Sequence, residues 1–145
     1  MAKITRDNPK LTLEGAVQVM ASAERRATEI GVPMNIAVVD DGGHLMAFVR
    51  MDAAKISSAE IAIVKAHGAA IRRQPTGPYI ENGQLNLVVT MGLMVGSGAR
   101  QTPLRGGVPL YVQGKCVGAI GVSNGNEEQD MDVAHAGAAA LDNEE

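Results

Sequence analysis

His44 is the residue whose type and setting point most directly to chemistry. It follows the turn Asp40-Asp41-Gly42-Gly43, and a neutral imidazole can ligate iron. Beside an apolar pocket, His44 would suit an axial haem ligand. The alternative is a solvated turn residue that is hydrogen-bonded to Asp40 or Asp41. Both interpretations stay open on sequence alone.

Lys65 and His67 lie two residues apart in a segment with helical spacing. At 3.6 residues per turn they are separated by roughly 200°, so they point to opposite sides of the helix. Lys65 is therefore expected to meet a carboxylate from another element, or a ligand, as a structural salt bridge or as a catalytic amine. His135, in the last helical segment, is expected at the surface.

The segment RQTPLRGGVP, from Arg100 to Pro109, could bind an acid. Arg100 and Arg105 offer planar donor forks, and glycines at Gly106-Gly107 let backbone N–H groups approach a ligand. Such a concavity suits a haem propionate or a small organic acid. The alternative is a turn leading into a strand, with solvated arginines. We expect this bend and His44 to converge on one sheltered hollow.

Glycines also interrupt the last predicted strand, at Gly118 and Gly121. A strand glycine loses backbone entropy and packs no side chain, so its presence indicates that another backbone or a ligand comes close. Tight packing of a helix on the sheet and the floor of a ligand site are both compatible with this pattern. Zinc-ligand spacing, a phosphate loop and a dinucleotide fingerprint are not found in the sequence.

Apolar spacing and capping signals divide the first half of the chain into three elements. Thr12 can cap a helix with one apolar stripe, which Gly31 and Pro33 would end. Two apolar runs then flank the Asp-Gly turn and predict a β-hairpin. Ser57 and Glu60 have the spacing of a capping box for a second helix. These elements are expected at residues 13–30, 34–49 and 57–73.

The second half begins with a poorly patterned stretch from Thr76 to Arg105, in which 85–95 could be a strand or a short helix. A hairpin is predicted at 108–123, and Asn126 with Gln129 can cap a final helix that ends at Leu141. Hairpin, loop and capped helix thus occur twice. This order predicts an α+β fold with an antiparallel sheet of roughly five strands flanked by helices.

Bulk composition narrows the function classes. The chain has 145 residues, 46% of them hydrophobic and only 2% aromatic, with a net charge of −3. We expect one domain over residues 1–145. Without a basic cluster or aromatic stacking residues, nucleic acid is not an expected partner. Without a long apolar segment, we expect no membrane association and a cytoplasmic location.

Several motifs in a fixed order resemble one family. They are VVDDGGHLMAFVRMDAA, Lys65-Ala66 on a helix, GGVPLYVQGKCVGAIGVS and EEQDMDVAHAGAAAL. Together, from about Leu11 to Leu141, they are similar to the GlcG/HbpS-like haem-binding family, which includes the C-terminal domain of PduO-type proteins. The resemblance implies a profilin-like α-β-α sandwich, a homo-oligomer and haem as a ligand. The chain departs from the family pattern at His67-Gly68 and at Asn124.

Two main functional hypotheses follow. The first is a protein that binds haem or a related tetrapyrrole in an apolar pocket, with His44 on the iron. The second is an enzyme that acts on a small carboxylate or an aromatic-catabolism intermediate by proton transfer; Arg100 or Arg105 would hold the acid, and the proton would be moved by His44, Lys65 or Asp41. An accessory protein that stabilises a partner enzyme is a third possibility. Whether the chain is an enzyme stays open.

Overall fold

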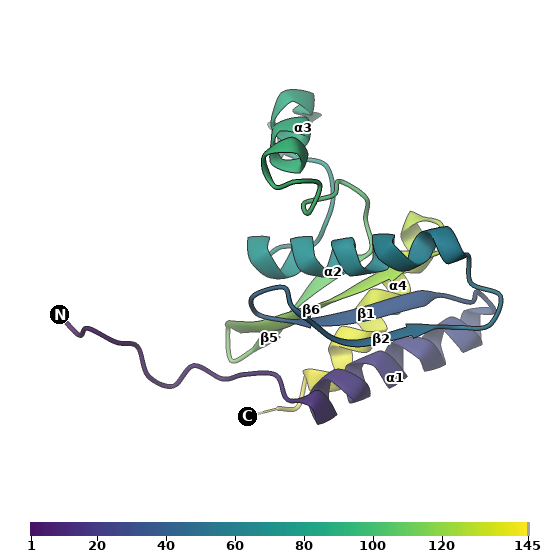
Figure 1. The fold of residues 1–145 in the computed structure, drawn as a ribbon, viewed down its shortest axis with the longest axis horizontal. Helices are drawn as coiled ribbons and strands as arrows, with labels where there is room; N and C mark the ends of the chain where they lie inside the picture. Colours follow the sequence, from purple (N-terminus) through teal and green to yellow (C-terminus); the bar gives the residue numbers. More distant parts are fainter. Residues whose placement is uncertain (145) are drawn as a thin grey trace.

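The computed structural model describes residues 1–144 and is built around one antiparallel sheet (Figure 1). Two hairpins meet through one strand of each, so that the strand order is β2-β1-β6-β5. The strands are β1 (Asn35–Asp40), β2 (Leu45–Arg50), β5 (Gly107–Val112) and β6 (Lys115–Ser123). Both predicted hairpins are confirmed. The sheet has four strands, which corrects the expected five.

Helices cover both faces of the sheet (Figure 1). On one face lies α2 (Ala59–Arg72), and on the other lie α1 (Leu13–Ile30) and α4 (Glu127–Ala138). The larger apolar cluster fills the space between the sheet and α1 with α4. Under α2 the core consists almost entirely of alanines, which brings this helix close to the sheet. The α+β class and the profilin-like α-β-α sandwich are confirmed.

Capping explains where two of these helices begin. The Thr12 side chain accepts a hydrogen bond from the Gly15 N–H, and the helix ends at Gly31 with a φ of 71°. Asn126 and Gln129 form the predicted capping box of α4. The chain then continues as a 3₁₀ turn, η2 (Ala139–Leu141).

The predicted capping box of the second helix is wrong. A 3₁₀ turn, η1 (Ile56–Ser58), precedes α2, so the chain is already helical at this point. Ser58 rather than Ser57 occupies the capping position, and its side chain makes no capping hydrogen bond. A residue in the right-handed helical region does not aim its oxygen back at the first helical N–H groups as an extended one does.

An arm stands away from the sandwich between α2 and β5 (Figure 1). It consists of β3 (Ile80–Glu81), β4 (Gln84–Leu85) and α3 (Leu87–Gly96). Asn86 accepts a hydrogen bond from the Val89 N–H, so the ambiguous stretch begins a helix instead of adding a fifth strand. Among residues 1–144, none of the helices has both the length and the apolar character needed to cross a bilayer.

The two strand glycines are explained by neighbouring backbone. A Cβ on Gly121 would lie within 3.0 Å of α2 at Ala62 and Ala66, and one on Gly118 would collide with the Val39 carbonyl group of β1. Gly107, beside Gly121 in the sheet, likewise faces the Lys65 carbonyl group. Close packing of a helix on the sheet therefore accounts for Gly121 without a ligand.

Candidate functional site

Two imidazoles lie against the Gly42-Gly43 turn between β1 and β2. His44 is exposed, and its Cδ2 is 3.1 Å from the place where a Cβ on Gly42 would stand. His67, half-buried on α2, has its Nδ1 2.9 Å from the Gly43 carbonyl oxygen. Gly43, with a φ of 82°, has no side chain where the His67 ring packs. The turn thus brings together two histidines that are far apart in the sequence.

The hydrogen bond of His67 fixes the state of its ring. A carbonyl oxygen can only accept, so Nδ1 carries the hydrogen and donates it to Gly43. In the neutral ring the lone pair then belongs to Nε2. An imidazole held in this way by a backbone carbonyl group is the usual arrangement of a metal-ligating histidine.

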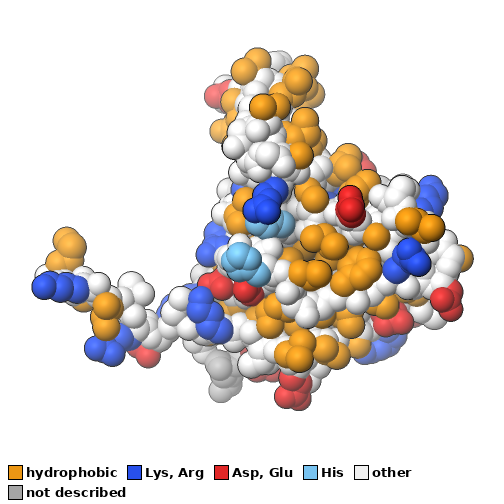
Figure 2. Space-filling view, in the orientation of Figure 1, with side chains coloured by type: hydrophobic (Ala, Val, Ile, Leu, Met, Phe, Trp, Pro, Cys, Tyr) orange, Lys and Arg blue, Asp and Glu red, His pale blue; other side chains and the backbone are white. Residues whose placement is uncertain are grey.

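Apolar side chains lie beside these imidazoles (Figure 2). Leu45 and Phe48 of β2 pair with Val39 and Ala37, so they lie on the α2 side of the sheet. They are 51% and 36% exposed. On α2, Ile63 and Ile71 precede and follow His67 by four residues and share its helix face. Figure 2 shows hydrophobic side chains beside the histidines on this side of the molecule. We call this surface the histidine face (His44, Leu45, Phe48, Ile63, His67, Ile71).

Charged residues border the turn of the histidine face. The Lys10 ammonium group lies 2.6 Å from Asp41 and lowers the pKa of that carboxyl group, mainly through their hydrogen bond. A carboxylate with a lowered pKa is a weaker proton acceptor at neutral pH. The Arg73 guanidinium donates to the Asp41 backbone carbonyl group. Asp41 is therefore held as an anion in the turn.

The two arginines predicted to hold an acid lie in different places. Arg100 is exposed where the chain returns from the arm, and its backbone passes over Gly68, next to His67 on α2. Arg105 lies 3.8 Å from Glu127 at the start of α4. Arg100 thus borders the histidine face, whereas Arg105 belongs to a second site.

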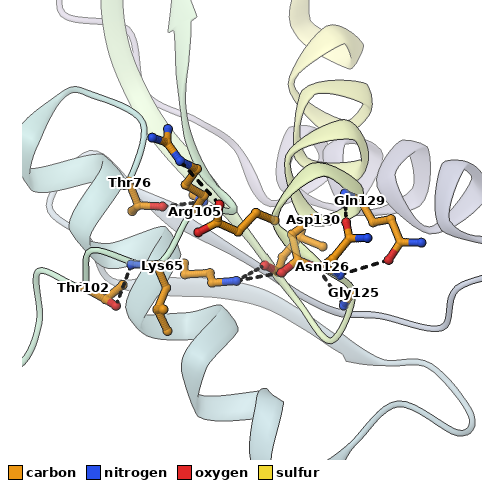
Figure 3. Close-up of polar contacts among 12 residues, drawn as sticks. Lys65, Thr76, Thr102, Arg105, Gly125, Asn126, Gln129 and Asp130 are labelled. Atoms are coloured by element: carbon orange, nitrogen blue, oxygen red, sulfur yellow. Dashed lines mark hydrogen bonds and ion pairs between the residues drawn. The ribbon is translucent and has the colours of Figure 1, made fainter. Parts of the chain in front are cut away.

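The second site is centred on Lys65, whose side chain is 4% exposed (Figure 3). Its ammonium group lies 2.9 Å from Asp130 Oδ2 and 2.9 Å from the Val122 carbonyl oxygen. Because α2 and α4 cover opposite faces of the sheet, this ion pair passes around the end of β6. The predicted partner of Lys65, a carboxylate from another element, is Asp130.

Asp130 has an unusual setting for a carboxylate. Its other oxygen accepts a hydrogen bond of 2.8 Å from the Gly125 N–H. Burial raises the pKa of its carboxyl group, and this effect exceeds the opposing influence of the Lys65 ammonium group. Removing this carboxyl group from water therefore costs more than its pairing with Lys65 returns.

A cavity of about 430 Å³ opens beside this ion pair. Its polar lining includes Lys65, Asp130, Arg105 and Ser123. Gly106 borders the ammonium group, since a Cβ there would lie 2.9 Å from Lys65 Nζ. The neighbouring Gly107 N–H donates to the Thr76 hydroxyl, 2.9 Å away. The Gly106-Gly107 bend thus adjoins Lys65, but the Gly107 N–H already donates its hydrogen bond to Thr76.

The expected convergence of His44 and the Gly106-Gly107 bend is wrong. Gly107 pairs with Gly121, which pairs with Ala37, three residues before Asp40 at the turn. Three strand residues span roughly 10 Å, and two further strand spacings separate β5 from β1. Helix α2 lies between the two features, with Lys65 on one side and His67 on the other. The sequence candidates therefore divide into two sites.

Two important residues were not singled out by sequence reasoning. His67 was placed on a helix without a role, and Asp130 lay within the motif of the last helix. Only the helical separation of Lys65 and His67 indicated that the two residues have different environments. His135 is exposed, as expected. The described residues contain no group of three or more His, Cys, Asp or Glu side chains arranged for a metal ion.

The three layers, the four-stranded sheet and the projecting arm define a small profilin-like α+β domain. The chain matches the family model described as haem degrading protein HbpS-like over residues 11–139. Protein GlcG of Escherichia coli strain K12 is 39% identical over 115 residues, which cover 78% of this chain and 81% of GlcG. The chain belongs to the HbpS-like family.

Two solved structures agree with this assignment. Protein ORFY of Klebsiella pneumoniae superimposes with a TM-score of 0.87 at 33% identity, covering 100% of this chain and 99% of that one. A structure described as a PduOC:heme complex superimposes with a TM-score of 0.78 at 28% identity, covering 91% of this chain and 95% of that one. The architecture is thus shared with both over at least 91% of this chain.

Proposed function

We propose that this protein binds haem or a related tetrapyrrole at the histidine face. The observation that supports the proposal is the pair of imidazoles at one turn, one exposed and one with its Nε2 lone pair set by a backbone hydrogen bond, within an apolar surface. Haem degradation in the family description and a haem complex of a relative support the same ligand class.

The residues present fit such a group. Leu45, Phe48 and Ile71 give an apolar surface for a flat macrocycle, and His44 remains the candidate residue to hold the iron, with His67 as a second imidazole. Arg100, exposed at the border, supplies a cation for a propionate. When bound, the iron would supply the redox and ligand-exchange chemistry of the group, while these residues hold and orient it.

A second copy of the chain would enclose this open surface. Helix α3 exposes Leu87, Val88, Met91 and Val95 and makes no extensive contact with other elements of the described chain. Apolar arms of this kind mark association sites, and most soluble oligomers are homo-oligomers. Figure 2 shows that the apolar arm and the histidine face lie on one side of the molecule. The arm of one copy is therefore proposed to cover the face of another.

Hemin titration of the purified protein tests the binding proposal. A saturable, shifted absorption band is expected, and it should be lost when His44 and His67 are both replaced by alanine. The single variants show which imidazole binds the iron. His135→Ala is the matched control, because that exposed imidazole lies on α4. No shifted band, or an unchanged band in the double variant, would contradict the proposal.

Light scattering tests the association. We expect a mass above that of one chain, which falls to one chain when Val88 and Val95 are both replaced by glutamate. These residues are 83% and 72% exposed, so the replacement leaves the core intact. A single-chain mass for the wild type at every concentration would contradict this part.

A further inference from the structure

The cavity beside Lys65 has features that the haem proposal does not use. It lies on the other side of α2 from the histidine face, and the Lys65–Asp130 ion pair forms part of its lining. A buried lysine is costly unless its charge is compensated and its donors are used. Each of the three N–H donors of Lys65 therefore needs an acceptor.

Donor counting leaves one N–H of Lys65 without an acceptor. An ammonium group has three hydrogens, and in residues 1–144 two acceptors lie within hydrogen-bond distance, Val122 O and Asp130 Oδ2. Gly106 keeps the space beside Nζ clear, although contact with the Val122 carbonyl group also excludes a side chain there. The third donor is thus available at the wall of the cavity.

Two hydroxyl groups in the lining are also without partners. Ser58 and Ser123 are 8% and 5% exposed, and neither hydroxyl makes a hydrogen bond within the described part of the chain. Both hydroxyl oxygens are accessible from the cavity, since neither is among the fully buried atoms without a partner. A donor from Lys65 and two hydroxyl groups therefore line one hollow, all free to meet a ligand.

Charge indicates the sign of that ligand. The titratable side chains of the lining are the cations Lys55, Lys65 and Arg105 and the carboxylates Glu127 and Asp130. Asp130 is engaged by Lys65, and the 3.8 Å separation of Arg105 from Glu127 is longer than a hydrogen bond. The Arg105 guanidinium is therefore able to turn to an anion in the cavity.

Ile61 and Leu104 form the apolar part of the lining, and Leu104 is 47% exposed at the rim. A volume of about 430 Å³ lies within the range of roughly 300–1,000 Å³ that is usual for small-molecule sites. Size, charge and lining together favour a compact organic acid over a macrocycle.

We propose that the Lys65 cavity binds the carboxylate group of a small organic acid, independently of the histidine face. The carboxylate accepts from Lys65 Nζ at the inner end, from Arg105 at the rim and from the Ser58 or Ser123 hydroxyl. The apolar body of the acid lies against Ile61 and Leu104. This assignment keeps Lys65 and Arg105 together as acid-binding residues and separates them from His44 and Arg100.

Fluorine NMR on haem-free protein tests this site. The probes are fluoroacetate, para-fluorobenzoate and para-fluorocinnamate, each compared with its neutral amide. At least one acid is expected to show saturable line broadening that its amide does not show. Loss of one charge-assisted hydrogen bond in Arg105→Gln should weaken that binding about tenfold or more.

The variants separate this site from the haem proposal. Lys65→Met is expected to abolish acid binding, and Ser123→Ala to weaken it in a protein whose ion pair is intact. His44→Ala is the control that should bind the acid as the wild type does. No binding by any acid, equal binding of acid and amide, or unchanged affinity in Arg105→Gln would overturn the proposal. None of these results bears on the hemin titration.

Discussion

Gly121→Ala is expected to be strongly destabilising although it adds a single methyl group. A Cβ at this position would lie within 3.0 Å of Ala62 and Ala66 of α2, where ordinary contact begins at 3.4 Å. The nearest neighbouring atom, the Ala62 carbonyl oxygen, would stand 2.1 Å from that Cβ. It belongs to the backbone and cannot rotate away, so α2 must move from the sheet by roughly 1 Å or more. Overpacking a filled core costs about 1–3 kcal/mol, and the rigid contact favours the upper end.

Urea unfolding and calorimetry measure this effect at one fixed protein concentration. A loss of about 3 kcal/mol corresponds to a fall in Tm of roughly 6–12 °C for a chain of this size. Gly92→Ala is the matched control, because a Cβ there meets nothing within 4 Å and α3 would gain helix propensity. If the free energy of unfolding of Gly121→Ala lay within about 0.5 kcal/mol of the wild-type value, the inference that α2 packs directly on the strand backbone would be refuted.

Other predictions concern the polar groups. Because burial raises the pKa of Asp130, the folded state binds this proton more tightly, and the wild type should gain stability relative to Asp130→Asn as the pH falls from about 7 to 4. Urea titrations measure this difference. If the wild type lost stability relative to Asp130→Asn on acidification, the Lys65 ion pair rather than burial would dominate the pKa of Asp130. Asn126→Ala should cost about 1 kcal/mol by removing the cap of α4, and Asn126→Asp should restore most of it. Lys65→Met leaves the buried carboxyl group without its cation and should lower the unfolding free energy by about 3–5 kcal/mol, measured in the same way.

Local signals in the sequence predicted most of the sandwich. Thr12, Gly31 and Asn126 each act through hydrogen bonds or φ values within a few residues, so their effect is visible in the sequence. The arm was not predicted, because α3 is apolar on all sides and has no partner that would impose a period. The Ser57–Glu60 spacing misled because a 3₁₀ turn already occupied that position.

The candidate sites were harder to predict because they depend on long-range contacts. His67 reaches the turn that holds His44 only because the β1–β2 turn lies against the side of α2, and Lys65 meets Asp130 only around the end of the sheet. Residue types identified Lys65, Arg105 and His44 as candidates, but not which of them are neighbours. The helical separation of Lys65 and His67 was the sequence signal that correctly placed them on different sides.

The position of α2 links the two proposed sites. Its close approach to the sheet, which Gly107 and Gly121 permit, directs Lys65 toward Asp130 and His67 toward Gly43. A rigid helix that shifts by roughly 1 Å changes both sets of contacts together. Gly121→Ala should therefore weaken acid binding and hemin binding in the same variant, whereas Arg105→Gln should affect the acid alone. If Gly121→Ala, like Arg105→Gln, weakened one binding activity and left the other unchanged, the position of α2 would not set the geometry of both sites.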